Sequence, residues 1–460
     1  MDSALRWVRE SLNGEQRNYT TGPLGKSIVL LAIPMILETL MESLFSVVDI
    51  FFVAKLGDGA VASVGLTESL LTFVFAVAMG LSYATTAYVA RRIGEGSPEE
   101  AARGAVQSVL IGLVASAVVG VIGVNYAEEL LALMGASAEV RQHSAYTRIV
   151  MGGSATVMML FLLNAIFRGA GDAVIAMKVL WLANGINILL NPCLIFGLGP
   201  FPEMGIAGSA IGTVIGRGCG VVYQLWHLFY GTGRIQVRWE QVQFDLGIMR
   251  HILRPALNGI FQIFVATASW TALFRIASMF GSEVLAGYTI AVRIVIFSIL
   301  PSWGLCNAAA TLVGQNLGAG KPQRAEAAVW QAGRYNAGFL GVLSLISLIW
   351  APQFISFFTK DAAVVASGAE CLRFFSAAYV ILGYGMMMEQ AFNGAGDTFT
   401  PTMVNLGCYW ALQIPFAWIL ATQSDWGVRG VFMAITVAET AVAIVAVYLF
   451  RRGTWKSQQI

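Results

Sequence analysis

Long apolar runs separated by short polar connections dominate the pattern of this 460-residue chain. A helix of about 20 apolar residues spans a bilayer core, and each of these runs reaches that length. Backbone polar groups in lipid must be satisfied within their own segment, so the pattern predicts an all-α integral membrane protein with twelve transmembrane helices. The runs lie near residues 27–54, 61–90, 104–125, 145–167, 174–197, 205–230, 247–280, 284–314, 327–350, 370–392, 401–421 and 430–450.

The composition supports a membrane protein and argues against several other classes. The chain is 57% hydrophobic and only 12% charged, with a mean hydropathy of +0.70, more apolar surface than a soluble chain of this length can bury. Five cysteines without a CxxC pair and three well-separated histidines predict neither a metal site nor a disulfide framework. We therefore predict no cofactor and no nucleic-acid partner, and expect a monomer surrounded by membrane lipids.

Basic residues are distributed unevenly among the connections. Lys and Arg are concentrated at both termini and in every second connection, whereas the remaining connections hold few. This bias predicts that both termini are cytoplasmic and that the protein is a multi-pass protein of the plasma (inner) membrane. Polar residues 1–26 are predicted to form an amphipathic cytoplasmic lead-in, and residues 451–460 a cytoplasmic tail.

The chain contains an internal repeat. Residues 80–101 match residues 304–325 at an offset of 224, and Phe-Arg-Gly-Ala-Gly-Asp at 167–172 matches Phe-Asn-Gly-Ala-Gly-Asp at 392–397 at an offset of 225. Further counterparts are Pro34 with Pro255, and Gly205 with Gly427. The matches predict two parallel, pseudo-symmetric six-helix bundles, residues 27–230 and 247–450, joined by a polar linker at 231–246. Two such bundles would enclose a central cavity and could open it alternately to either side of the membrane.

Three carboxylates interrupt the first apolar run. At about 100° per residue, Glu42 and Asp49 lie within about 40° of Glu38 around a helix, so all three share one stripe. A carboxylate that faces lipid costs several kcal/mol, which predicts that this helix lines a wet cavity and that Asp49 titrates or binds a cation. For Glu38 and Glu42, a position near the membrane surface or a bond to a neighbouring helix is the alternative.

The fifth helix carries two amides on one face. Asn187 and Asn191 are four residues apart, and Pro192 frees a backbone carbonyl. Beside Asp49 these groups would form an oxygen-rich pocket for a small cation such as Na⁺. The alternative is that the asparagines only bridge neighbouring helices.

Other residues within the apolar runs allow either a functional or a structural interpretation. Glu68, Glu389 and Glu439 are each either functional carboxylates or bridges between helices. Met387 and its two methionine neighbours either form an adaptable wall for varied ligands or belong to the ordinary core.

The paired Gly-Ala-Gly-Asp loops are predicted to be tight turns. Glycine permits positive φ, while Asp172 and Asp397 would cap the next helix or accept from loop amides. The alternative is a cytoplasmic gate in which Arg168 pairs with Asp172.

Together these features resemble the multidrug and toxic compound extrusion (MATE) family, in its NorM- and DinF-like bacterial branches of the MOP superfamily. The resemblance rests on Ser-Val-Val-Asp-Ile-Phe-Phe-Val-Ala-Lys-Leu-Gly at 46–57, on the paired Gly-x-Gly-Asp loops and on Asn191-Pro192, and covers roughly residues 25–450. It implies a V-shaped pair of six-helix lobes that exports small amphipathic, often cationic, compounds in exchange for H⁺ or Na⁺.

The resemblance also implies which residues bind the coupling ion. Asp49 occupies the place of the family's helix-one aspartate, Asn187 and Asn191 match its helix-five pair, and Thr213 matches a helix-six threonine. Gln262 stands near the position where some members carry a helix-seven acid. The resemblance therefore assigns ion coupling to the first lobe rather than the second.

Two other functions were weighed against multidrug efflux. A lipid-linked oligosaccharide flippase would need a cationic cavity for a pyrophosphate, whereas the central helices here carry acids. An intramembrane enzyme would need a catalytic or metal cluster, and the sequence contains no HExxH motif or Ser/Lys constellation. We therefore predict a transporter and not an enzyme.

Overall fold

The computed structural model describes residues 2–14 and 18–460, so residues 1 and 15–17 of the predicted lead-in lie outside the described part. The described residues contain helices and no strand. The helices of the first half are α1 (Asp2–Asn13), α2 (Leu24–Val53), η1 (Ala54–Leu56), α3 (Asp58–Gly94), α4 (Pro98–Asn125), α5 (Ala127–Leu133), α6 (Ala138–Arg141), α7 (Ser144–Gly152), α8 (Ser154–Ala170), α9 (Ala173–Phe196) and α10 (Ile206–Tyr230). The linker and second half contain η2 (Trp239–Gln241), α11 (Leu246–Ala277), η3 (Ser278–Phe280), α12 (Ser282–Gly318), α13 (Pro322–Ser356), α14 (Ala362–Ala377), α15 (Tyr379–Ala395), α16 (Phe399–Asn405), η4 (Leu406–Gln413), α17 (Ile414–Thr422), α18 (Val428–Arg452) and η5 (Thr454–Ser457).

The predicted spans are present, and two of them are broken. Within the described residues, ten helical segments are long and apolar enough to cross a membrane by themselves. Two bent pairs complete the twelve: α7 and α8 meet at 40°, and α14 and α15 meet at 57°. Each pair replaces a single predicted run, 145–167 or 370–392, so the all-α membrane fold is confirmed, with a bend at the same place in each half.

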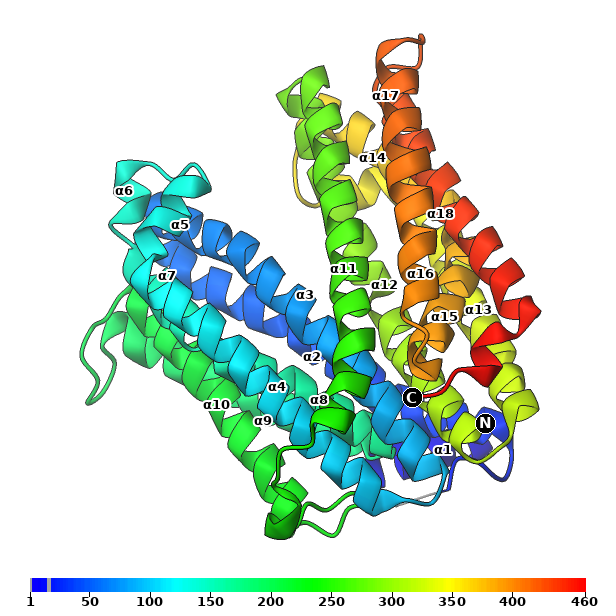
Figure 1. The fold of residues 1–460 in the computed structure, drawn as a ribbon. Coiled ribbons are helices and arrows are strands. Elements are labelled where there is room, and N and C mark those ends of the chain that lie inside the picture. The colour runs from blue at the N-terminus through cyan, green and yellow to red at the C-terminus, as the bar shows by residue number, and fades with distance from the viewer. Residues whose placement is uncertain (1, 15–17) are drawn as a thin grey trace.

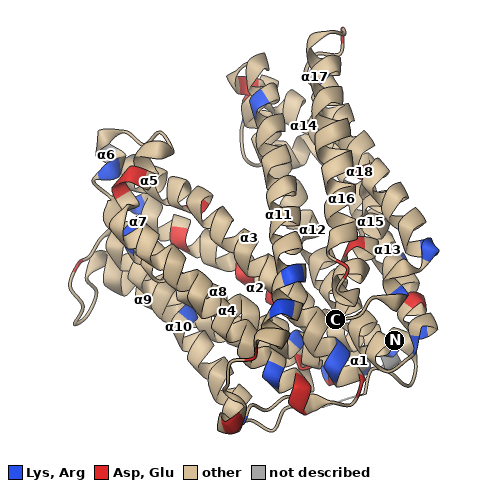
Figure 2. Ribbon diagram, viewed as in Figure 1, with Lys and Arg blue, Asp and Glu red and all other residues tan. Residues whose placement is uncertain are grey.

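The helices form two lobes that meet at one end of the molecule (Figure 1). We call α2–α10 the N-lobe and α11–α18 the C-lobe. The lobes diverge away from the end where both termini lie, which gives the V shape that the resemblance implies. Figure 2 shows that Lys and Arg gather toward the end where the lobes meet.

Glycines at this junction show the twofold relationship between the lobes. A Cβ atom on Gly80 would lie 2.4 Å from the backbone nitrogen of Ile260, and one on Gly304 would lie 2.5 Å from the Cα of Ile36. The glycines and the isoleucines are both 224 residues apart, so the same contact is made twice with the lobes exchanged. The absence of a side chain lets the backbones of α3 and α12 approach the first helix of the opposite lobe.

The register of the repeat corrects one predicted counterpart. The turns after α2 and α11 contain Gly57 (φ 102°, ψ 172°) and Gly281 (φ 105°, ψ 165°), again 224 residues apart. This register pairs Pro34 with Asn258, so the proposed equivalence of Pro34 and Pro255 is wrong. The two prolines interrupt α2 and α11 at different depths.

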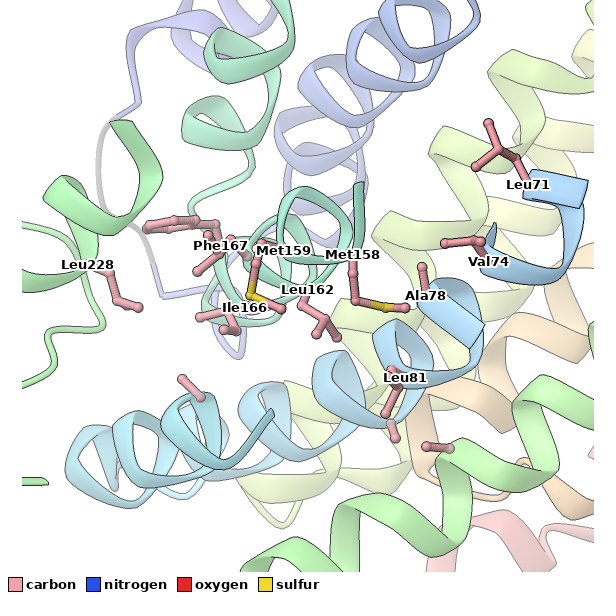
Figure 3. Close-up of a cluster of buried hydrophobic side chains, with 14 of the residues drawn as sticks. Leu71, Val74, Ala78, Leu81, Met158, Met159, Leu162, Ile166, Phe167 and Leu228 are labelled. Carbon is pink, nitrogen blue, oxygen red and sulfur yellow. The ribbon is translucent and has the colours of Figure 1, made fainter. Parts of the chain in front are cut away.

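Buried side chains of α3 and α8 fill the centre of the N-lobe (Figure 3). The figure shows Ala78 and Leu81 of α3 approaching Met158 and Leu162 of α8, and each of these residues is at most 2% exposed. This rigid interior fixes the positions of the helices that surround the candidate site.

The first helix of each half contributes to both lobes. Ile28, Leu31 and Met35 of α2 pack in a cluster with C-lobe residues, whereas Phe45 packs with α8 and α9 in the N-lobe. In α11, Ile252 belongs correspondingly to the N-lobe cluster. The sequence repeat therefore divides the chain between α10 and α11. The hydrophobic cores follow a different division, because the first part of α2 packs in the C-lobe core and the first part of α11 packs in the N-lobe core.

Candidate functional site

The carboxylate stripe of α2 faces the interior of the N-lobe. Glu38 Oε1 lies 2.7 Å from Arg168 Nη1 on α8, and Glu42 Oε1 lies 3.6 Å from Arg217 Nη2 on α10. Both arginines are largely buried. Both glutamates therefore bond to neighbouring helices, which is the alternative that the sequence left open. Each carboxylate is neutralised by a base of the same lobe.

Asp49 lies within a cluster of polar side chains from three helices. Its Oδ1 accepts from Asn191 Nδ2 at 2.7 Å, from Thr213 Oγ1 at 3.0 Å and from Asn187 Nδ2 at 3.4 Å. Thr213 Oγ1 is also 2.8 Å from Oδ2. Asp49 is 6% exposed and the other three residues are 0–4% exposed. The structure therefore brings together the four residues that sequence reasoning selected.

This cluster has the chemistry of a site for a small hard cation or a proton. Asp49, Asn187, Asn191 and Thr213 supply carboxylate, amide and hydroxyl oxygens, the donors that Na⁺ and related ions take. Asn191 Oδ1 is buried, and no described protein group donates to it. Protonation of Asp49 would instead add a donor among several acceptors.

A buried arginine, Arg217, pairs with Glu42 near the cluster. The guanidinium of Arg217 lies 4.6 Å from the centre of the Phe45 ring, and it is close enough to act electrostatically on Asp49. Sequence reasoning did not select Arg217. The position of Arg217 within the apolar run of the sixth helix could have identified it, because a base at that depth needs an acidic partner.

A separate cavity of about 450 Å³ lies between the C-lobe helices and α3 of the N-lobe. Gln262 and Glu389, which the sequence suggested as substrate, cavity or gating residues, lie in its lining together with Glu439. Met387 does not line it: this side chain is fully buried in a core cluster, and its neighbour Met386 faces the cavity instead. Adjacent helical positions point about 100° apart, which explains the difference.

No residue of α2 lines this cavity. That the carboxylate stripe of the first helix lines a wet cavity stays a prediction. Hydrogen bonds draw Asp49 into the contact of α2 with α9 and α10. Glu68 is half-buried on α3. It too lies outside the residues that line the C-lobe cavity.

A model of the MatE family matches the chain twice, over residues 34–193 and 260–419. The two matches span more than half of the chain and fall one in each half of the repeat. The chain belongs to the MATE family.

Known proteins of similar length and shape agree with this assignment. The chain is 24% identical to a Thermotoga maritima protein named probable multidrug resistance protein NorM, over 95% of this chain and 94% of that protein. It is also 24% identical to a Shewanella oneidensis FAD transporter, over 95% and 97% of the two chains. A crystal structure of a MATE transporter in its bent conformation superimposes with a TM-score of 0.88 at 25% identity, covering 98% of this chain and 97% of the other.

The family assignment confirms several predictions. MATE proteins are integral membrane transporters and not enzymes, and the multidrug relatives support a role in multidrug efflux.

The Gly-Ala-Gly-Asp loops of this MATE transporter are tight turns. Gly171 and Gly396 end α8 and α15 with φ of 90° and 86°. Asp397 accepts from the Thr400 amide at 3.2 Å, whereas Asp172 accepts from the Arg234 amide of the linker at 3.1 Å. Burial raises the pKa of the Asp172 carboxyl.

The suggested Arg168–Asp172 gate is not formed among the described contacts. The guanidinium of Arg168 is paired with Glu38 instead, within the N-lobe. Its backbone carbonyl accepts from the Thr311 hydroxyl of α12 at 3.2 Å. Arg168 thus joins the carboxylate stripe to the junction between the lobes, but through a different residue from the one predicted.

Proposed function

We propose that this MATE transporter exports small amphipathic organic cations in exchange for H⁺ or Na⁺, and that Asp49 binds the coupling ion with Asn187, Asn191 and Thr213. The observation that carries the proposal is the buried Asp49 carboxylate, held by three polar side chains of α9 and α10. A buried carboxylate without its own ion-pair partner is costly, so an ion or proton that neutralises it changes the stability of the surrounding helices.

The coupling would work through the two arrangements of the lobes. With both termini cytoplasmic, the end where the lobes meet would be the closed cytoplasmic side, and the diverging end would face outward. Ion binding at Asp49 from outside would relax the contacts of α2 and favour closure of the outer side. Release of the ion to the cytoplasm would then reset the cycle.

The available driving force is adequate for such a switch. A membrane potential of 100 mV supplies about 2.3 kcal/mol for each charge moved across the bilayer. One pH unit adds about 1.4 kcal/mol. In this proposal the protein acts as a monomer in the plasma (inner) membrane, with membrane lipids as its surroundings and without a bound cofactor.

The test is transport in proteoliposomes. Asp49→Asn should abolish substrate efflux driven by an imposed pH or sodium gradient, while substrate exchange without a gradient continues. Asp425→Asn makes the same chemical change at an exposed aspartate between α17 and α18 and should leave both activities unchanged. Ion-driven efflux at the wild-type rate in Asp49→Asn would refute the proposal.

A second candidate is export of an anionic compound, favoured by the similarity to a protein named as an FAD transporter. The same chemistry would suit the lipid-linked pyrophosphate of a flippase. Either substrate would need bases to bind its phosphates. The described residues that line the C-lobe cavity contain two carboxylates and no base, which favours organic cations over both alternatives.

A further inference from the structure

The chain turns back after α18, the last long helix of the C-lobe. Gly453 ends this helix in the left-handed conformation, with φ of 75°, and its amide donates to the Phe450 carbonyl at 3.1 Å. Residues 453–460, which we call the tail segment, then leave the foot of α18 and run toward the junction between the lobes (Figure 1). The tail segment therefore lies across the end of the molecule where the two lobes meet.

The first half of the tail segment is anchored in the C-lobe. The Trp455 side chain is fully buried, and its ring stacks on that of Phe450 with 4.8 Å between the ring centres. Its Nε1 donates to the Phe450 carbonyl at 3.0 Å. Lys456 Nζ lies 2.6 Å from Glu326 Oε2 of α13. A buried aromatic ring and an ion pair hold this part to one lobe, so it moves with the C-lobe.

The second half of the tail segment contacts the N-lobe. Arg91, in the last turn of α3, donates through its guanidinium to the Gln458 carbonyl. Its neighbour Arg92 donates likewise to the Ile460 carbonyl. The Ile460 side chain packs against the core cluster of the N-lobe. Because hydrogen bonds from charged groups are stronger than those between neutral groups, these contacts connect the two lobes through the tail segment.

The repeat does not provide these two arginines in the other half of the chain. At the offset of 224, Arg91 corresponds to Gln315 and Arg92 corresponds to Asn316. Gln315 Nε2 donates to the Gly169 carbonyl at 2.9 Å, and Asn316 Nδ2 donates to a carbonyl of its own helix. The two bases therefore stand only in the half whose α3 the tail segment crosses, as a role in binding that segment requires.

The tail segment meets α3 where α3 also contacts the C-lobe helix α12. A Cβ atom on Gly318 would collide with the Arg91 carbonyl, and one on Gly94 would collide with the Gln315 carbonyl. In the proposed transport cycle this end of the molecule opens, which separates α3 from α12. Because the tail segment is fixed to the C-lobe, the same movement draws its second half away from the arginines.

We propose that the tail segment is a latch, which holds the lobes together on the proposed cytoplasmic side and must release Arg91 and Arg92 before this side opens. The latch stabilises the state in which the lobes diverge toward the outside. This inference rests on the proposed alternating movement of the lobes, and it adds a regulatory element that lies outside the membrane-spanning helices.

The first test measures how often the latched side is open. Spin labels on Glu99→Cys and Gln323→Cys, exposed and equivalent positions at the start of α4 and α13, report the distance between the lobes in micelles. The background lacks the two partly exposed cysteines. Arg91→Gln with Arg92→Asn gives α3 the residues that α12 carries. We expect the fraction of long distances to rise at least about threefold, since two charge-assisted hydrogen bonds are lost. An unchanged fraction would overturn the proposal.

Two further variants separate the latch from a general loss of charge. Arg141→Gln removes an exposed arginine of α6 and should leave the fraction of long distances unchanged. Ile460→Ala keeps both latch arginines but removes the side chain that packs against the N-lobe, and should give a smaller rise in the same direction. An equal rise in Arg141→Gln, or no rise in Ile460→Ala, would overturn the assignment to the tail segment.

A cleavable cross-link tests the latch with both of its arginines in place. In the same cysteine background, Glu95→Cys and Gln459→Cys place two thiols beside Arg92, which contacts both Glu95 and Ile460. A bis-methanethiosulfonate linker between these thiols should abolish ion-driven efflux in proteoliposomes, and cleavage by dithiothreitol should restore it. Since one folded protein is measured before and after cleavage, a folding defect cannot produce this result. Equal efflux from the linked and the cleaved protein would refute the latch.

Failure of the latch differs from failure of the proposed coupling. If Arg91→Gln with Arg92→Asn leaves the distances unchanged while ion-driven efflux still depends on Asp49, the latch is refuted and the coupling proposal stands. If the distances respond but efflux is independent of Asp49, the coupling proposal is refuted and the latch stands.

Discussion

The N-lobe cluster around Asp49 and the C-lobe cavity lie in the two halves of one repeat, yet charged residues of one half have different counterparts in the other. At the offset of 224 that relates the turns after α2 and α11, Asp49 corresponds to Leu273, which is 1% exposed in the C-lobe core. At the offset of 222 that relates Gly205 and Gly427, Arg217 corresponds to Glu439. The position of a base in one lobe is thus the position of an acid in the other.

The difference shows that backbone symmetry and site chemistry vary independently. Glycine contacts such as Gly80 with Ile260 and Gly304 with Ile36 keep the lobes in the same relationship. The N-lobe supplies its own arginines and hydrogen-bond donors to the carboxylates of α2, and this compact cluster is the site that we propose for the coupling ion. In the C-lobe, Glu389 and Glu439 line a cavity of about 450 Å³ whose described lining residues include no base. Four predictions test this comparison, from the largest expected effect to the smallest.

Transplanting the N-lobe carboxylate should have the largest effect. Leu273→Asp places a carboxylate in an apolar core without the amide and hydroxyl donors that surround Asp49, so the free energy of unfolding in micelles should fall by about 5 kcal/mol. Leu273→Asn, which adds no charge, should cost less. Equal losses in the two variants would contradict the view that the surroundings of Asp49 stabilise its charge.

Breaking a buried ion pair of the carboxylate stripe on α2 should have the second-largest effect on stability. Glu38→Gln leaves Arg168 without its carboxylate and should lower the free energy of unfolding by about 3 kcal/mol. The control is Glu100→Gln, which breaks the exposed pair with Arg103 at 3.2 Å and should cost less than about 0.5 kcal/mol. Chemical unfolding curves of both variants provide the comparison. A similar small loss at both positions would show that the stripe needs no internal counter-charge.

Adding one methyl group at the junction should disturb the closed end of the molecule. Gly304→Ala would place a carbon 2.5 Å from Ile36 Cα and should destabilise this junction by about 2 kcal/mol. Gly338→Ala has no heavy atom within 4 Å of the new carbon and is the matched control. Spin-label distances across the junction should lengthen only in Gly304→Ala. If they lengthen equally in both, the close approach of the backbones is not what holds this end together.

The smallest effect is expected at the paired loops. Burial raises the pKa of Asp172, so its ionised form is disfavoured in the folded protein. The folded state therefore binds the proton more readily than the unfolded state, and stability rises as pH falls from neutral through the raised pKa toward the ordinary value of 3.8. Asp172→Asn should remove this gain and add less than about 1 kcal/mol near pH 7. Thermal unfolding between pH 4 and pH 7, with Asp397→Asn as control, measures it; an unaltered pH dependence in Asp172→Asn would assign the effect to another group.

Much of the fold follows from periodicity, and part of the site follows from spacing. Asn187 and Asn191 lie four residues apart on one helix face, and the repeat with its family resemblance directs that face toward Asp49. The pairing of Glu38 with Arg168 depends on contacts between helices 130 residues apart in the chain, which local patterns do not specify. The π-helix at 406–413 has no marker in its sequence, so the meeting of Tyr409 with Glu439 could not be anticipated.

The exchange of half a helix between lobes has a consequence for how the protein is made. The first turns of α2 complete the C-lobe interior, and the first turns of α11 complete the N-lobe interior. An N-terminal half emerging alone from the ribosome would insert into the membrane with part of its apolar surface uncovered, and would acquire its final packing only once the second half had been synthesised. Biogenesis of the two lobes is therefore mutually dependent, and separately expressed halves should be stable only when they are produced together.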